Sequence, residues 1–152
     1  MALRPTRNEF LTDLSFFMNE TSERGVLAVA STQGSGAAMD DSSAAVKLPD
    51  TRADKPVGLL LCDVVNLDLT RQHINYAKDE MQKGGKVLLL RRGFVVTNMI
   101  SGAITMGDAC HFVEDGNLCS ASASTGDTSA QVGRWLSKKD ADGYAKVEIN
   151  IV

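Results

Sequence analysis

The sequence predicts a mainly β fold: a small β-barrel or β-sandwich with one or two peripheral helices. Two strand-like runs, residues 87–90 and 94–96, flank Arg91-Arg92-Gly93 and are apolar without alternation, which is typical of strands covered on both faces. Asp115-Gly116 separates two further strand-like segments and favours a tight hairpin. Residues 144–151 alternate between apolar and polar, as a strand with one buried face does.

Composition limits the classes of function that the chain can serve. The 152 residues fit one domain, and 16 Lys and Arg against 19 Asp and Glu give a net charge of −3, which argues against direct nucleic-acid binding. Three cysteines without a CxxC spacing predict neither a disulfide framework nor a zinc site. The start of the chain lacks the apolar core of a signal peptide, and no run reaches the length of a membrane span. We therefore expect no cofactor, no metal and no membrane contact.

The first 24 residues form a unit of their own, an N-terminal arm or helix ahead of a single β domain at 25–152. Thr6 and Glu9 have the spacing of a capping box, and apolar residues then recur at helical intervals: Phe10, Leu14, Phe17 and Met18. This pattern predicts a helix laid over the sheet. The other interpretation is an arm that docks on a second chain.

The middle of the chain holds one long loop and one ambiguous segment. Residues 25–30 and 57–65 are apolar and predict strands, whereas 31–55 is a polar, small-residue loop with a brief edge strand near 45–48. Residues 69–83 keep a helical spacing and end at a Gly-Gly pair, which favours a helix. An extended excursion is the alternative for this segment.

The last third predicts two hairpins. The first joins 109–114 to 117–123, and the second pairs 131–138 with 144–151. The turn of the second contains Asp140-Ala141-Asp142-Gly143, which lacks the spacing of a calcium loop and is interpreted as a hairpin turn. Trp135, the only tryptophan, is expected to anchor the core or a subunit interface.

No catalytic signature is present in the sequence. Cys110 and His111 are adjacent in a predicted strand and so point to opposite faces. Cys119, across the hairpin, could approach His111, but the sequence supplies no third orienting group. We therefore expect a protein that is not an enzyme; a small oligomeric enzyme using these three residues is the alternative.

Several segments, read in chain order, resemble one known family. They are LRPTRNEF and FFMNET near the start, PVGLLLCDVVNLDLTRQHIN and KDEMQKGGKVLLLRRGFVVTN in the middle, and a GD…DGNL hairpin followed by VGRWLSKKDADGYAKVEINI near the end. Together they cover most of the chain. They resemble the small cement, or head decoration, proteins of tailed bacteriophages, including those of cyanobacterial phages.

The resemblance implies a β-rich structural protein, commonly trimeric, on the outer surface of the mature capsid and assembled in the host cytoplasm. Such a protein clamps neighbouring copies of the major capsid protein together and opposes the pressure of the packaged DNA. The partners expected from it are the major capsid protein and other copies of the chain. The family has no catalytic residues to transfer.

The expected contacts with the capsid or a neighbouring subunit come from apolar residues: Phe10, Leu14, Phe17, Met18 and Trp135. The doubly apolar strands are also expected to supply a subunit interface. The alternative function is a carbohydrate-binding or host-adhesion module displayed on the particle. It would need a cluster of exposed aromatic residues, and aromatic residues make up only 5% of the chain.

Overall fold

A computed structural model of the chain describes residues 2–31, 45–63, 80–81, 83–121, 123–124 and 127–151. The regular secondary structure of the described residues consists of strands and one 3₁₀ turn at Glu114–Gly116, and these residues include no α-helix. The strands are β1 (Asn8–Met18), β2 (Ser22–Glu23), β3 (Leu27–Ala30), β4 (Ala45–Lys47), β5 (Pro56–Asp63), β6 (Glu80–Met81), β7 (Lys86–Thr97), β8 (Ala109–Phe112), β9 (Leu118–Cys119), β10 (Ala123–Ser124), β11 (Asp127–Thr128), β12 (Gly133–Trp135) and β13 (Ala145–Asn150). The prediction of a mainly β fold is therefore confirmed.

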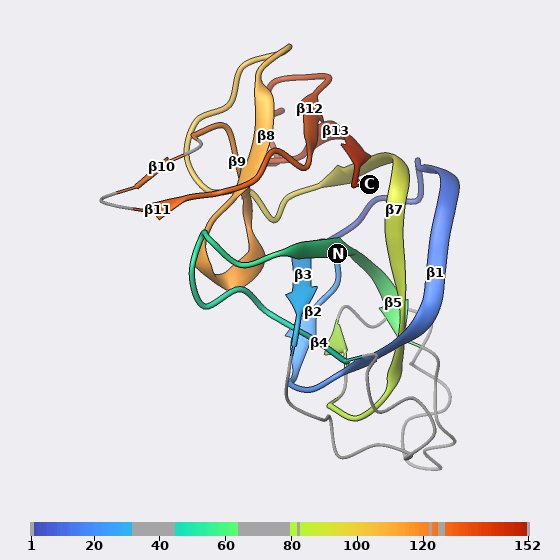
Figure 1. Cartoon of the computed structure of the whole chain (residues 1–152). Helices are drawn as coiled ribbons and strands as arrows, with labels where there is room; N and C mark the ends of the chain where they lie inside the picture. Colours follow the sequence, from blue (N-terminus) through green and yellow to red (C-terminus); the bar gives the residue numbers. More distant parts are fainter. Residues whose placement is uncertain are drawn as a thin grey trace.

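One large sheet contains most of the strands and closes on itself at one end (Figure 1). Its order is β1-β4-β3-β5-β7-β13-β12-β8-β9, and β1 also pairs with β7. The strands β1, β4, β3, β5 and β7 thus form a closed ring, a small barrel. The other four strands continue the sheet beyond β7, and two short pairs, β10–β11 and β2–β6, lie outside it.

β7 is the strand on which the two halves of the fold meet. Along one edge it pairs first with β5 and then with β13, and along the other edge it pairs with β1. The sequence predicted two separate strands here, but β7 runs unbroken from Lys86 to Thr97. Gly93 (φ 155°) lies inside it without a turn, and a Cβ at this position would come 2.2 Å from the backbone oxygen of Asn8. The glycine therefore permits the close approach of β1.

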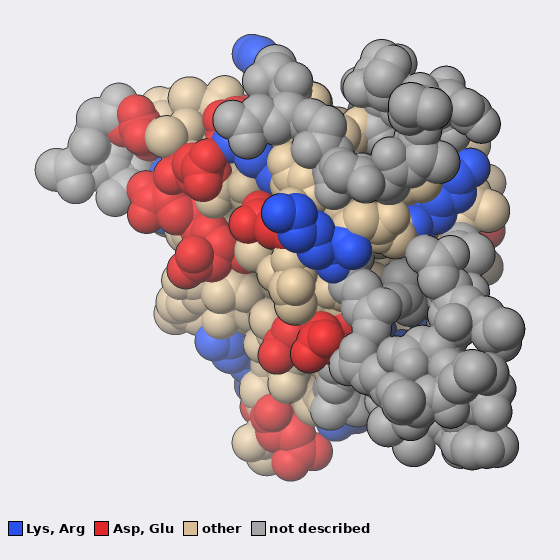
Figure 2. Space-filling view, turned by 90° about the horizontal axis from the view of Figure 1, so that it is seen from below, with Lys and Arg blue, Asp and Glu red and all other residues tan. Residues whose placement is uncertain are grey.

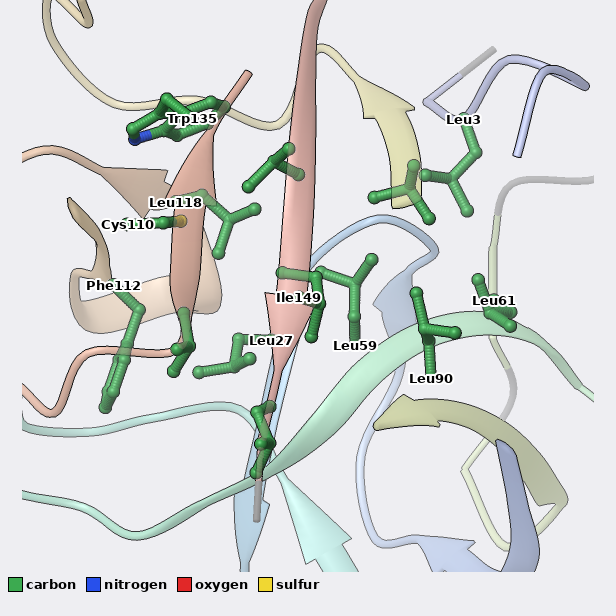
Figure 3. Packing of buried hydrophobic residues seen from close by; sticks show 14 of the residues in the cluster. Leu3, Leu27, Leu59, Leu61, Leu90, Cys110, Phe112, Leu118, Trp135 and Ile149 are labelled. Atoms are coloured by element: carbon green, nitrogen blue, oxygen red, sulfur yellow. The ribbon is translucent and has the colours of Figure 1, made fainter. Parts of the chain in front are cut away.

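Two hydrophobic cores lie on opposite sides of the shared strands. The small core is built from the strands of the ring together with β6, and the large core lies between the ring and the β13-β12-β8-β9 part of the sheet (Figure 3). Alternate residues of β5 enter different cores: Leu59 and Leu61 enter the large core and Leu60 enters the small core. Each fully buried leucine contributes about 1.5–3 kcal/mol relative to its exposed state.

The two cores explain the apolar runs that lack alternation. Both faces of β3, β5 and the first half of β7 are covered inside a single chain, and Leu59, Leu60 and Leu61 are fully buried. The chain covers them with its own sheet, because that sheet closes into a ring and then folds back over the ring. In the second half of β7, Arg92 is exposed and Phe94 is half-buried, so a subunit interface stays a prediction for that part of the strand only.

The N-terminal segment differs most from the prediction. Residues 8–18 form β1, a strand rather than a helix, and it pairs antiparallel with β7 over most of its length. Three register shifts, after Glu9, Leu11 and Asp13, interrupt its alternation. Extra residues at β-bulges shift the apolar side chains away from a period of two, so the segment acquires a spacing that resembles a helix.

The remaining predictions divide into three groups. The brief strand near 45–48 is present as β4, but it lies between β1 and β3 rather than at an edge. The two C-terminal hairpins are confirmed by the antiparallel pairs β8–β9 and β12–β13. Most of the helix expected at 69–83, and most of the long loop at 31–55, lie outside the described residues; Glu80 and Met81 form β6. No helix in the described part of the chain has the length and apolar character needed to cross a membrane.

Candidate functional site

β1 carries most of the exposed apolar side chains. The described residues include four large hydrophobic side chains that are exposed, and three of them lie in β1: Phe10, Leu11 and Leu14, which are 61%, 52% and 48% exposed. One edge of β1 pairs with β7, whereas among the described residues the other edge pairs with β4 only at Phe17 and Met18. Exposed apolar groups gathered on one element are typical of a protein–protein contact.

Both ends of this strand are fixed to the β domain. Before it, the backbone oxygen of Ala2 accepts hydrogen bonds from the Thr97 hydroxyl (3.0 Å) and the Asn98 N–H (3.3 Å), and Leu3 is buried. At the other end, the Met18 N–H donates to the backbone oxygen of Gly85 at 3.0 Å. The apolar side chains of β1 are therefore presented on a fixed strand, which limits the entropy lost when a partner binds.

An aromatic pair orders the exposed surface between β1 and β7. The rings of Phe10 and Phe94 meet edge to face, with centroids 5.6 Å apart and an interplanar angle of 82°. Lys146 places its Nζ 5.4 Å from the centroid of the Phe94 ring. Pairs of these two kinds each contribute about 0.5–1.5 kcal/mol, which holds Phe10 against the sheet while most of its ring stays exposed.

Strand register extends this surface across three strands. Arg92 pairs with Leu11 of β1, and Phe94 pairs with Glu148 of β13. Val147 enters the large core, so its neighbours Lys146 and Glu148 face outward together with Phe94. We call this surface the aromatic face and define it by five residues: Phe10, Leu11, Arg92, Phe94 and Lys146. Its exposed charges, Arg92 and Lys146, are both positive.

A polar groove borders the aromatic face. Its volume is about 400 Å³, and it is lined by residues of β12, β13 and the segment before β12: Gln131, Gly133, Arg134, Glu148 and Asn150. Arg134 pairs with Glu148 across the two strands. A Cβ on Gly133 would come 1.8 Å from the backbone oxygen of Glu148, so only glycine allows the two strands to approach this closely.

The structure separates the five residues that the sequence selected for partner contact. Phe10 and Leu14 are exposed on β1, whereas Phe17 is 9% exposed and lies under the ammonium group of Lys86, 5.3 Å from the ring centroid. Met18 is fully buried in the small core. Trp135 is fully buried in the large core, and its Nε1–H donates to the backbone oxygen of Cys119 at 3.3 Å.

Phe17, Met18 and Trp135 therefore contribute to the packing of the chain, and we leave them out of the contact surface. Four of the five residues of the aromatic face were missed in the sequence: Leu11, Arg92, Phe94 and Lys146. Leu11 lay outside the helical face assumed for this segment. Phe94 belonged to an apolar run that was interpreted as buried on both sides, although the neighbouring Arg92 was a signal that one side is exposed.

The cysteines and histidine of the first hairpin are adjacent but buried. Cys119 pairs with His111 across β8 and β9, and the Nδ1 of His111 lies 3.1 Å from the backbone oxygen of Ser129. Burial raises the pKa of the Cys110 thiol. Burial also raises the pKa of Cys119, despite the opposing effect of the Arg52 guanidinium. Buried thiols that stay protonated are weak nucleophiles, so this cluster has the character of core packing.

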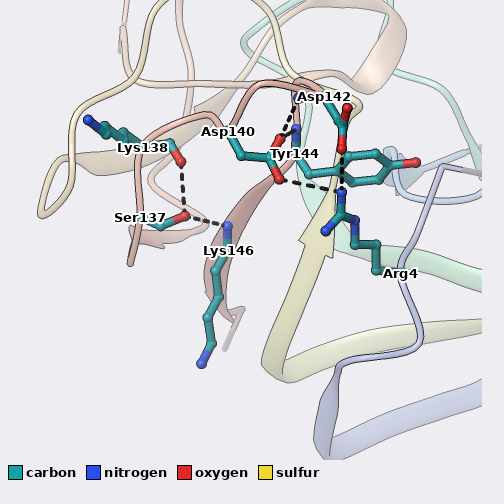
Figure 4. A network of polar contacts seen from close by, with 7 residues as sticks. All are labelled: Arg4, Ser137, Lys138, Asp140, Asp142, Tyr144 and Lys146. Carbon is teal, nitrogen blue, oxygen red and sulfur yellow. Dashed lines mark hydrogen bonds and ion pairs between the residues drawn. The ribbon is translucent and has the colours of Figure 1, made fainter.

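The acidic turn between β12 and β13 is held by hydrogen bonds within the turn (Figure 4). Asp140 Oδ1 accepts the N–H groups of Asp142 (3.0 Å) and Tyr144 (2.8 Å). The guanidinium of Arg4 pairs with Asp140 (3.4 Å) and Asp142 (3.3 Å) and lies over the Tyr144 ring. Gly143, at φ 85°, closes the turn, as predicted. Within the described ranges, no group of three or more His, Cys, Asp or Glu residues is arranged to hold a metal ion.

A comparison with protein families identifies one match. The family model described as XM1 gp53 minor capsid protein matches residues 6–151. This range includes the whole aromatic face and nearly all the residues of both cores. No curated protein matches the chain.

Proposed function

The chain belongs to the XM1 gp53 minor capsid protein family, and on that premise we propose that it is a decoration, or cement, protein of a bacteriophage head. It is a structural protein of the virion. In the proposal it binds the outer surface of the mature capsid as an oligomer, most simply a trimer, and contacts the major capsid protein. It stabilises that lattice against the pressure of the packaged DNA.

The observation that carries the proposal is the exposed apolar strand β1. Phe10, Leu11 and Leu14 are held on a strand whose two ends are fixed to the domain. A structural protein needs such a surface because it acts only through contacts with its neighbours. The polar hairpin turns and the buried thiols offer no comparable site for chemistry.

The proposed mechanism is thermodynamic linkage. A protein that binds the expanded lattice but not its dissociated subunits stabilises the lattice by its binding free energy. An oligomer that engages several capsid subunits at once adds avidity to each individual contact. Modest individual contacts then add up to a large effect over the whole shell.

Co-sedimentation with phage heads tests the proposal. The purified protein is mixed with empty expanded heads and, separately, with unexpanded proheads. We expect it to sediment with the expanded heads only. The triple variant Phe10→Ser/Leu11→Ser/Leu14→Ser should lose this binding, whether β1 contacts the capsid directly or holds the oligomer together. Met106→Ser is the matched control, since Met106 is 70% exposed but lies outside β1. Normal binding by the triple variant would refute the role of β1.

A carbohydrate-binding or host-adhesion module remains the second candidate. The observation that favours it is the polar groove, which is lined by amide and charged side chains and includes Glu148, the cross-strand partner of Phe94. Aromatic rings next to hydrogen-bonding groups are typical of small-ligand sites. Binding to a glycan array that is lost in Arg134→Ala would support this function, and an array without signal would count against it.

A further inference from the structure

The side of the molecule away from the aromatic face carries an acidic surface. It is formed by the loop between β4 and β5 and by the 3₁₀ turn, which are joined by a hydrogen bond from the Asp115 N–H to the backbone oxygen of Pro49 (3.3 Å). We call it the acidic surface and define it by four residues: Asp50, Asp54, Glu114 and Asp115. Asp50, Glu114 and Asp115 are exposed, and Asp54 is half-buried.

The nearby cations leave the acidic surface with a negative charge. Lys47 forms an ion pair with Asp50, and Lys55 is exposed at the end of the same loop. The Asp54 carboxylate accepts the N–H groups of Asp50 (2.9 Å) and Thr51 (3.2 Å), which fixes the loop. Four carboxylates therefore stand against two ammonium groups and the buried guanidinium of Arg52, which leaves one negative charge in excess.

The acidic surface and the aromatic face lie on different sides of the molecule. In Figure 1, β1 and β7 lie on the right and the loop between β4 and β5 lies on the left. Figure 2 keeps this left–right arrangement and shows Asp and Glu gathered on the left. The aromatic face is positively charged through Arg92 and Lys146, and the charges of the nearby Arg134 and Glu148 cancel each other. The flanking Arg7 and Glu9 pair with each other at 2.6 Å.

We propose that the aromatic face of one copy docks on the acidic surface of the next copy, so that the protein assembles head to tail. This inference rests on the proposed function and identifies the interface of its oligomer. In such an interface Arg92 and Lys146 of one copy meet Asp50 and Glu114 of the neighbour, and Phe10 and Leu11 are covered. A head-to-tail contact closes into a ring when its rotation permits, and a trimer is the simplest such ring.

Charge decides between this arrangement and a two-fold dimer. A two-fold contact places the same patch on both subunits, so two aromatic faces would bring the cations Arg92 and Lys146 of both copies together. Like charges placed against each other disfavour association. The complementary charges occur on two separate surfaces of one chain, and a head-to-tail contact uses both.

Charge-reversal variants of the full chain test the inference without phage heads. Sedimentation velocity at low salt measures the assembly of the wild type, Arg92→Glu/Lys146→Glu, Asp50→Lys/Glu114→Lys, and a chain that carries all four changes. We expect a ring for the wild type. Each double variant should raise the apparent dissociation constant at least about tenfold. The fourfold variant should recover assembly, because both surfaces are then reversed.

Other outcomes would overturn the inference. A monomeric wild type at high concentration would do so, as would assembly that is lost only when the aromatic face is reversed. Carbodiimide cross-linking of the wild type gives a second readout that does not depend on the folding of a variant. We expect an intermolecular amide between Lys146 and Asp50 or Glu114, and its absence from a cross-linked oligomer would contradict the arrangement. A ring that does not bind heads would refute the proposed function and leave this interface intact.

Discussion

Truncating neighbouring leucines of β5 tests whether one chain buries both faces of its central strands. Leu59 enters the large core and Leu60 the small core, and neither is exposed. Leu59→Ala and Leu60→Ala should each destabilise the protein by about 3–5 kcal/mol, because a buried leucine loses its transfer free energy and leaves a cavity. In a chain of this size the melting temperature should fall by roughly 6–20 °C.

Urea unfolding, followed by circular dichroism at two protein concentrations, provides the measurement. Met106→Ala is the control: truncating an exposed side chain outside β1 should change stability by no more than about 0.5 kcal/mol. The two-core account is refuted if either β5 variant lowers the free energy of unfolding by less than about 1 kcal/mol. It is also refuted if this loss depends on protein concentration, because another copy would then cover the face of β5 that carries the truncated leucine.

Three further predictions concern the closure of the ring, the thiols and the pH dependence. Gly93→Ala should lower the free energy of unfolding in urea by about 1–3 kcal/mol, because the new Cβ would meet the backbone oxygen of Asn8. Unchanged stability would mean that β1 does not pack against β7 at this position. In the native protein, iodoacetamide should alkylate the half-buried Cys62 before the buried Cys110, because burial raises the pKa of the Cys110 thiol. Preferential labelling of Cys110 would contradict its burial in the large core. The pKa of Asp13 is lowered by two hydrogen bonds from Ser15, one from its hydroxyl and one from its backbone N–H. Its stabilisation is therefore present above the unfolded-state pKa and lost as the pH falls through the folded-state value. Between about pH 5 and pH 3 the wild type should lose more stability than Asp13→Asn, and an equal loss would refute the assignment.

The sequence predicted the strands whose pairing is regular. β13 alternates in the sequence and has alternating burial in the structure. Asp115 and Gly116 both adopt positive φ, 75° and 80°, as the dipeptide indicated. β1 could not be recognised, because its register shifts depend on a partner strand that lies about 80 residues further along the chain. The ring and the two cores depend on the same long-range pairing.

The candidate surface was only partly visible in the sequence. Phe10 and Leu14 were selected as apolar residues near the start of the chain, and the structure leaves both exposed. Trp135 and Met18 were selected on the same chemical grounds, but they are buried. Residue type and spacing indicate which side chains favour burial, whereas the topology decides whether the chain or a partner buries them.

Cryo-electron microscopy of heads assembled with and without the protein tests the proposed function most directly. Reconstructions of expanded heads should show additional density on the outer surface, with β1 of each copy turned toward a neighbouring copy or the capsid. Unexpanded proheads should lack this density. The account would be contradicted if the protein lies inside the shell or at the portal, or if no density accompanies it.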